Sequence, residues 1–197
     1  MLKTTEQLIY DLRDYSSPNC KLNRLVKEGK LEQIKQGLYT EGEEPDPRTL
    51  ATTFVNPSYI SFNAALSYHD MIPEYVYTMT CATHSKTKSK HFSFKYIDYY
   101  YYDVPTEVYH IGIYFEEVDS GDTYWIATKE KALCDKLYHI GPRNNLPEME
   151  DLILDDPRIN EYRLNEIDID LLREIESRYH CRNVTLFLKW IERRNSQ

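Results

Sequence analysis

The apolar positions of the first thirty residues follow the period of two short helices. Within residues 4–15 they fall at i, i+1 and i+4, which marks one face of a helix that Thr4 or Thr5 can cap. A second helix is predicted to begin at Asn19, which can act as its N-cap, and to end at Gly29, which can adopt a left-handed conformation there. The apolar stripe of this second helix is Leu22, Leu25 and Val26, so its other side is expected to be exposed.

Two short strands are predicted after the second helix, at residues 31–35 and 38–40, with a turn at Gln36-Gly37. A basic helix followed by such a hairpin has the order of a winged helix-turn-helix, whose recognition helix enters the major groove of DNA. Residues 16–19 leave no room for a further helix before it, which counts against a complete helix-turn-helix. The residues expected to bind DNA are Asn19, Lys21, Arg24, Lys27, Lys30, Lys35 and Gln36. The alternative is a merely solvated basic face.

Residues 41–47 combine acidic residues, a glycine and two prolines, which neither a helix nor a strand favours. We therefore expect a linker there, between one domain over residues 1–41 and another over residues 42–197. In the larger domain a helix is predicted at residues 61–71. Strands rich in Tyr, Val, Ile, Thr and Phe are predicted at residues 75–83, 90–97, 99–104, 107–117 and 122–127. The remaining pattern is helical, at residues 128–140, 147–155, 169–179 and 183–193.

The predicted fold class is α+β. It consists of a small N-terminal winged-helix domain followed by a mixed domain, in which a sheet with helices precedes a helical C-terminal third.

Composition adds charge and compartment to this picture. The chain has 197 residues, with 24 lysines and arginines against 32 aspartates and glutamates and a formal net charge of −8. Residues 1–40 carry seven bases and five acids, so the expected DNA-binding part is slightly basic on an acidic chain. The four cysteines lie far apart, which predicts reduced, mostly buried thiols. No stretch offers the ~20 apolar residues that span a bilayer, and no signal peptide is visible, so a cytoplasmic protein is expected.

The candidate chemistry of the larger domain is sparse. Four consecutive tyrosines, Tyr99–Tyr102, could stack on bases, but strand alternation and the flanking Asp98 and Asp103 favour packing within the sheet. Asp168 is expected to cap the helix that follows it. The chain has no phosphate-binding glycine loop, serine-hydrolase motif, zinc-protease motif or kinase motif. No cofactor, metal site or catalytic residue is therefore predicted.

Three longer strings of residues resemble the AbiEi family of antitoxins. Residues 25–39 read LVKEGKLEQIKQGLY. Residues 57–68 read PSYISFNAALSY, with Ile72-Pro73-Glu74 shortly after them, and residues 126–138 read IATKEKALCDKLY. Because the order and spacing of the three strings agree with that family, the chain is similar to it over most of its first two thirds.

The resemblance implies a bacterial two-domain regulator from an abortive-infection toxin–antitoxin pair. In that family a winged-helix domain binds promoter repeats of its own operon and represses it, while the larger domain counters a nucleotidyltransferase toxin. The pair is of type IV, so antitoxin and toxin need not form a stable complex. The resemblance places Lys21, Arg24 and Lys27 on the recognition helix and Lys30, Lys35 and Gln36 on the wing. The larger domain's motif residues are Tyr59, Ser61, Thr128, Glu130, Lys131 and Asp135.

Motif membership alone gives these last residues no chemical role. Thr128 can cap its helix while Glu130 favours the helix dipole. Lys131 and Asp135 are four residues apart and can form a helical ion pair, worth ~0.2–0.5 kcal/mol if exposed. A rival interpretation is an enzyme that modifies the toxin or its target, for example by phosphotransfer, with Glu130, Lys131 and Asp135 as polar participants. A third is a plain protein-binding module. The leading expectation is a non-enzymatic antitoxin whose partners are operator DNA and the toxin, with no membrane.

Overall fold

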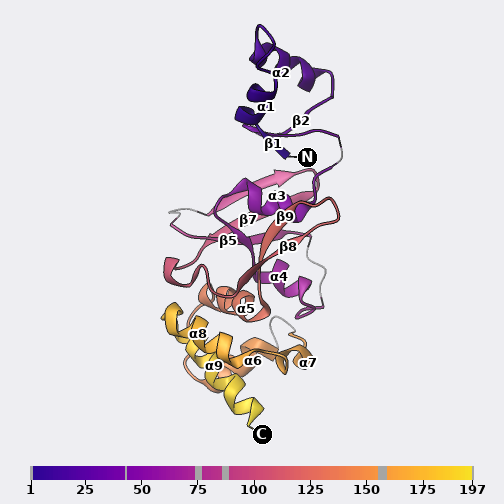
Figure 1. Cartoon of the computed structure of the whole chain (residues 1–197). Helices are drawn as coiled ribbons and strands as arrows, with labels where there is room; N and C mark the ends of the chain where they lie inside the picture. The colour runs from indigo at the N-terminus through magenta and orange to yellow at the C-terminus, as the bar shows by residue number, and fades with distance from the viewer. Residues whose placement is uncertain (1, 43, 74–76, 86–88, 155–158, 197) are drawn as a thin grey trace. The chain divides into compact units, whose positions relative to one another are not determined.

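The structure is a computed structural model that describes residues 2–42, 44–73, 77–85, 89–154 and 159–196 (Figure 1). The chain divides into two compact units, Met1–Asp46 and Pro47–Gln197.

The first unit is a three-stranded antiparallel sheet with two helices. Its elements are β1 (Leu2–Thr4), α1 (Thr5–Asp11), α2 (Pro18–Lys27), β2 (Glu32–Lys35) and β3 (Leu38–Thr40). The strand order is β1-β3-β2, so β3 lies between the other two strands. The two helices and the hairpin were predicted, whereas β1 was not, because three residues are too few to show strand alternation. Leu8, Leu22 and Leu31 form a buried apolar cluster in this unit.

The helix ends of the first unit confirm two predicted caps and correct a third. Thr4 caps α1 in a capping box with Gln7. Gly29, with φ of +69°, ends α2 as predicted. The prediction of Asn19 as N-cap is wrong: Ser17 takes that place and Pro18 is the first helical residue. Proline suits that position because its missing N–H would have no partner in the helix.

The second unit contains a mixed six-stranded sheet. Its strands are β4 (Tyr59–Ile60), β5 (Met79–Thr83), β6 (Lys90–Phe94), β7 (Ile97–Asp103), β8 (Ile113–Glu117) and β9 (Thr123–Ala127), in the order β6-β7-β5-β4-β9-β8. Pairing is parallel for β4 with β9 and for β5 with β7, and antiparallel elsewhere. The five-strand prediction missed β4. The predicted strand over residues 107–117 is too long, because a 3-10 helix (Thr106–Val108) and a turn occupy its first half.

Helices cover both faces of this sheet. The helices described in this unit are α3 (Pro47–Phe54), α4 (Phe62–Tyr68), α5 (Lys129–Tyr138), α6 (Leu146–Leu154), α7 (Glu161–Leu164), α8 (Ile169–Tyr179) and α9 (Arg182–Asn195). The Tyr101 hydroxyl donates to the Ala51 carbonyl of α3 at 2.6 Å, while the Tyr102 ring packs 5.2 Å from the Phe62 ring of α4. Neighbouring strand residues point to opposite faces, so α3 and α4 lie on opposite sides of β7. The α+β class is therefore confirmed.

The tyrosine run and the cysteines have mixed outcomes. Tyr99 and Tyr101 are buried and pack in the sheet core as predicted. All four cysteines are free, but only Cys81 and Cys134 are buried, and Cys20 is exposed on α2. The prediction of mostly buried thiols is therefore wrong for the first unit. Within the described ranges, no helix has the length and apolar character needed to cross a membrane.

Candidate functional site

The outward face of α2 carries the basic residues predicted to contact DNA. Because Leu22 is buried and successive helical residues are about 100° apart, Arg24 and Lys27 project on the opposite side. Both are exposed, as is Asn23 beside them. Asn19 is exposed too, but the helical period places it on the flank, towards the buried stripe. Asn23, which was not predicted to bind DNA, occupies a better position to reach a base. Its place directly before Arg24 in the sequence was the signal that could have identified it.

Several of these bases have weak partners within the first unit. The Lys21 ammonium lies 4.7 Å from the ring centroid of Tyr15. Arg24 Nε is 3.4 Å from one carboxylate oxygen of Glu28, and Lys30 Nζ is 3.0 Å from the other. Exposed ion pairs of this kind contribute about 0–1 kcal/mol. Lys21 and Lys30 therefore remain available to phosphates.

The hairpin after α2 brings the remaining predicted residues to its tip. Gln36 and Gly37 form the turn between β2 and β3, and Gly37 has a φ of +85°, which favours glycine. Lys35 is half-buried at the end of β2, and Gln36 is exposed. Strand β1 pairs with β3 along its length. The hairpin is therefore part of a three-stranded sheet, which anchors the strands below its tip.

A second set of predicted residues meets inside the second unit. The carboxylate of Asp135 on α5 accepts three hydroxyl hydrogen bonds, from Tyr59 at 2.9 Å, Ser61 at 2.6 Å and Tyr179 at 2.7 Å. Lys131 Nζ lies 2.8 Å from the same carboxylate. We call these five residues the Asp135 cluster. Four of its members belong to the motif residues, while Tyr179, on α8, was not predicted.

The Lys131 ammonium depends on very few groups. Its contact with Asp135 is an ion pair whose angles do not fit a hydrogen bond, so Nζ has no hydrogen-bond partner of good geometry. The ring centroids of Tyr179 and Tyr59 lie 4.9 and 5.7 Å from Nζ, within the range of cation–π attraction. Both charged side chains are 0 % exposed. The ion pair of Lys131 with Asp135 was predicted, but the free energy expected for an exposed helical ion pair does not apply to a buried one.

Burial also keeps the hydroxyl donors of the cluster protonated. Burial raises the pKa of Tyr59 well above its usual value, and the neighbouring Asp135 carboxylate raises it further. The pKa of Tyr179 is raised for the same two reasons, burial being the larger. Both phenols therefore remain neutral at physiological pH and can donate to the carboxylate.

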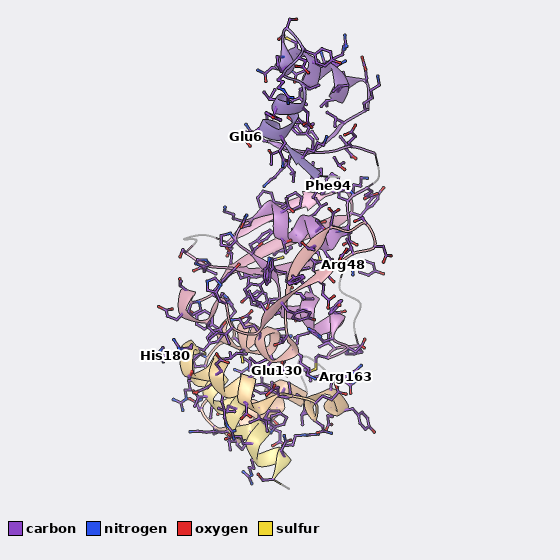
Figure 2. All side chains as sticks on the ribbon, in the orientation of Figure 1. Glu6, Arg48, Phe94, Glu130, Arg163 and His180 are labelled. Carbon is purple, nitrogen blue, oxygen red and sulfur yellow. The ribbon has the colours of Figure 1, made fainter. Side chains whose placement is uncertain are left out.

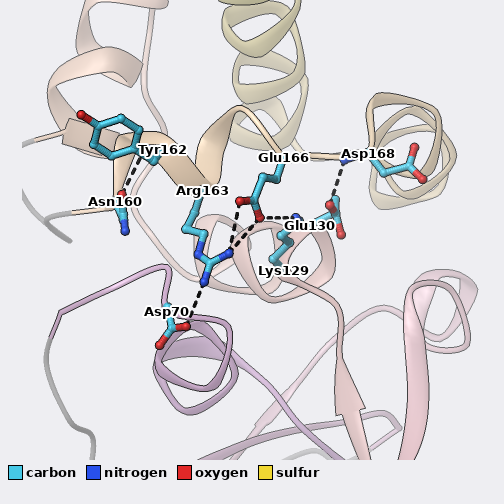
Figure 3. Close-up of polar contacts among 8 residues, drawn as sticks. All are labelled: Asp70, Lys129, Glu130, Asn160, Tyr162, Arg163, Glu166 and Asp168. Atoms are coloured by element: carbon cyan, nitrogen blue, oxygen red, sulfur yellow. Dashed lines mark hydrogen bonds and ion pairs between the residues drawn. The ribbon is translucent and has the colours of Figure 1, made fainter.

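The other two motif residues support the start of α5. Thr128 caps the helix, since its hydroxyl accepts from the Lys131 backbone N–H at 3.3 Å, which confirms that prediction. Glu130 lies on α5 between the sheet and the C-terminal helices (Figure 2). Its carboxylate accepts from the Asp168 backbone N–H at 2.9 Å (Figure 3). Asp168 in turn caps α8, as predicted, by accepting from the N–H groups of residues 170 and 171.

An exposed polar network runs beside this contact (Figure 3). The Arg163 guanidinium donates to Asp70 at 3.0 Å and to Glu166 at 3.1 and 3.2 Å. Lys129 reaches Glu166 at 3.4 Å. These bonds join the end of α4, the start of α5 and the segment after α7, so the network holds elements together at the surface.

The Asp135 cluster lies in the interior of the second unit and links three of its elements. It connects β4, α5 and α8 through a carboxylate that is closed off from solvent, and Tyr59, Ser61, Lys131 and Asp135 are each 0 % exposed. A nucleophile or general base must touch its substrate, and these polar groups are enclosed within the unit. Among the residues that the structure describes, no group of three or more His, Cys, Asp or Glu side chains could hold a metal ion.

No protein-family model and no curated protein sequence matches this chain.

Proposed function

We propose that this chain is an antitoxin of an AbiE-like toxin–antitoxin system, which represses its own operon by binding DNA through the first unit. The observation that carries the proposal is the exposed face of α2, with Arg24 and Lys27 opposite its buried stripe. Phosphates are bound mainly by lysine and arginine, and bases by arginine and asparagine. A short helix with this face can supply both kinds of contact.

The order of elements in the first unit supports a winged helix. A strand, two helices and a hairpin follow one another, and the first strand pairs with the last to give the order β1-β3-β2. In this proposal α1 is the helix that precedes the recognition helix α2, and residues 12–17 between them contain no further helix. The hairpin tip at Gln36 then serves as the wing beside the DNA backbone.

Counteraction of a nucleotidyltransferase toxin is proposed for the second unit. The Asp135 cluster supports this only indirectly, because its side chains are buried inside the unit. We therefore assign the toxin-related role to exposed surfaces of the unit. The modifying-enzyme interpretation receives no support from the groups on which it relied, since Lys131 and Asp135 are enclosed and Glu130 holds a backbone N–H.

The test is binding of the full chain to its own upstream DNA across a salt series, compared with a charge-reversed α2. The variant replaces Lys21, Arg24 and Lys27 with glutamate. The matched control is Lys90→Glu, Lys189→Glu and Arg193→Glu, which reverses three exposed bases of the second unit.

We expect specific binding by the wild type and the control, and its loss in the α2 variant. The slope of log affinity against log salt should also become shallower by about 0.9 for each lost phosphate contact. Equal binding by the wild type and the α2 variant would refute the proposal that α2 contacts DNA.

A further inference from the structure

An acidic residue lies among the bases of α2. Glu28, the residue at the C-cap of the helix, places one carboxylate oxygen 3.4 Å from Arg24 Nε and the other 3.0 Å from Lys30 Nζ. The Lys30 hydrogen bond, with the charges of Lys30 and Arg24, lowers the pKa of Glu28. Its side chain is therefore ionised at neutral pH. A negative charge at this place repels DNA phosphates, so a helix that only needed affinity would gain nothing from it.

The backbone brings the three side chains together. Gly29 has a φ of +69°, its N–H donates to the Val26 carbonyl at 3.1 Å, and the Lys30 N–H donates to the Leu25 carbonyl at 3.0 Å. These two bonds form a Schellman turn, which reverses the chain at the helix end. Glu28 and Arg24 are four residues apart on one helix and are neighbours on its surface. The turn thus places Lys30 on the far side of the same carboxylate.

The contact between Glu28 and Arg24 lies on the Nε side of the guanidinium. Oε1 of Glu28 is 3.4 Å from Nε of Arg24, and the two terminal nitrogens form the opposite edge of the guanidinium. Those two nitrogens are the pair that can bind the O6 and N7 atoms of guanine together. A guanidinium whose Nε faces a carboxylate samples fewer orientations before binding. Such a side chain loses less conformational freedom when an interface forms.

We propose that Glu28 is a positioning residue that orients the Arg24 guanidinium towards a guanine edge in the major groove. The inference rests on the proposed DNA-binding function of α2. It makes Glu28 a determinant of sequence specificity, obtained at the expense of overall affinity.

The experiment selects binding sites from a random duplex DNA library with the full chain. It compares the wild type with Glu28→Gln and Arg24→Ala. The matched control is Glu6→Gln, which removes the same charge from an exposed position on α1. For the site that the wild type selects, Kd is then measured with and without each guanine replaced by adenine in its base pair.

The wild type should prefer guanine at one position, and Arg24→Ala should remove that preference. Glu28→Gln should bind all duplexes more tightly, yet its discrimination at that position should fall about fivefold. Glu6→Gln should keep the wild-type discrimination. A role of Glu28 in helix stability alone would change affinity at all sites and leave the discrimination at this base unaltered.

Two results would overturn the inference while the proposed function stands. One is an unchanged guanine preference in Glu28→Gln, and the other is a preference that survives Arg24→Ala. A wild type that enriches no sequence and binds no duplex would instead overturn the proposed DNA-binding function, and the inference with it.

Discussion

Replacing Asp135 with asparagine should destabilise the Pro47–Gln197 unit strongly. Asparagine has almost the same shape but carries no charge, so the Lys131 ammonium would remain 0 % exposed without the carboxylate that balances it. Breaking a buried ion pair in this way costs about 3–5 kcal/mol. This is a large part of the ~5–15 kcal/mol that keeps a domain folded. For a unit of this size it corresponds to a fall in Tm of about 10 °C.

The partner substitution should cost less. In Lys131→Met the methionine fills most of the space of the lysine stem, and the Asp135 carboxylate keeps its three hydroxyl donors at 2.6–2.9 Å. One lost partner at a buried polar group costs about 1–3 kcal/mol. The double variant should be more stable than Asp135→Asn alone, because the unpaired ammonium is gone.

The assay is urea unfolding of the full chain followed by tryptophan fluorescence. The chain has two tryptophans, Trp125 and Trp190, both in the second unit, so the signal reports that unit. The free energy of unfolding is compared for the two single variants and the double variant. If Lys131→Met costs as much as Asp135→Asn, or if the two effects simply add, the reasoning about the dependence of Lys131 on Asp135 is refuted.

Three further outcomes are expected from the same unit. The pKa values of Tyr59 and Tyr179 are raised on folding, so their stabilising contribution is complete below pH ~10 and is lost as the pH rises above it. Replacing either residue with phenylalanine should make this decline in unfolding free energy shallower by about 1.4 kcal/mol per pH unit. Urea unfolding in a series of alkaline buffers measures the slope. Gly112→Ala should lower the free energy of unfolding in urea by about 1–3 kcal/mol, since φ at this residue is +70° and the new Cβ would lie 3.0 Å from an α5 side chain. Gly141→Ala, at a residue with open space around it, should change this free energy little. Asn183→Asp should lower Tm, because the buried amide donates to three carbonyls at and just after the end of α5, at 3.0–3.3 Å, and a carboxylate cannot donate. An unchanged Tm in a thermal scan would contradict this.

The elements with a strong apolar period were predictable from the sequence. Helix α5 was expected from the spacing of Leu133 and Leu137, which are both buried. In contrast, α3 was not predicted, although Leu50 and Phe54 are buried at helical spacing. Its first residue, Pro47, lies two residues after Pro45, and the two prolines were interpreted as the end of a linker. Proline is in fact acceptable in the first turn of a helix.

The candidate sites were predictable in part, for a physical reason. Local chemistry shows in the sequence, so the ion pair of Lys131 with Asp135 and the cap at Thr128 could be named in advance. Burial and long-range partners depend on tertiary packing. Tyr179 is 44 residues from Asp135 and donates to it at 2.7 Å, yet nothing in the local pattern marks it. The enclosure of the cluster, which decides its role, was likewise not visible.

Strand β4 shows what the Asp135 cluster means for strand register. It has two residues, paired as Tyr59 with Ala82 and Ile60 with Cys81, and it joins β5 to β9 at the centre of the sheet. A strand so short cannot fix its own alignment through hydrogen bonds along its length. A slip by one residue would turn the tyrosine away from Asp135 and place the isoleucine against a buried charge. The polar cluster therefore penalises every misaligned pairing of the strand that holds the two halves of the sheet together.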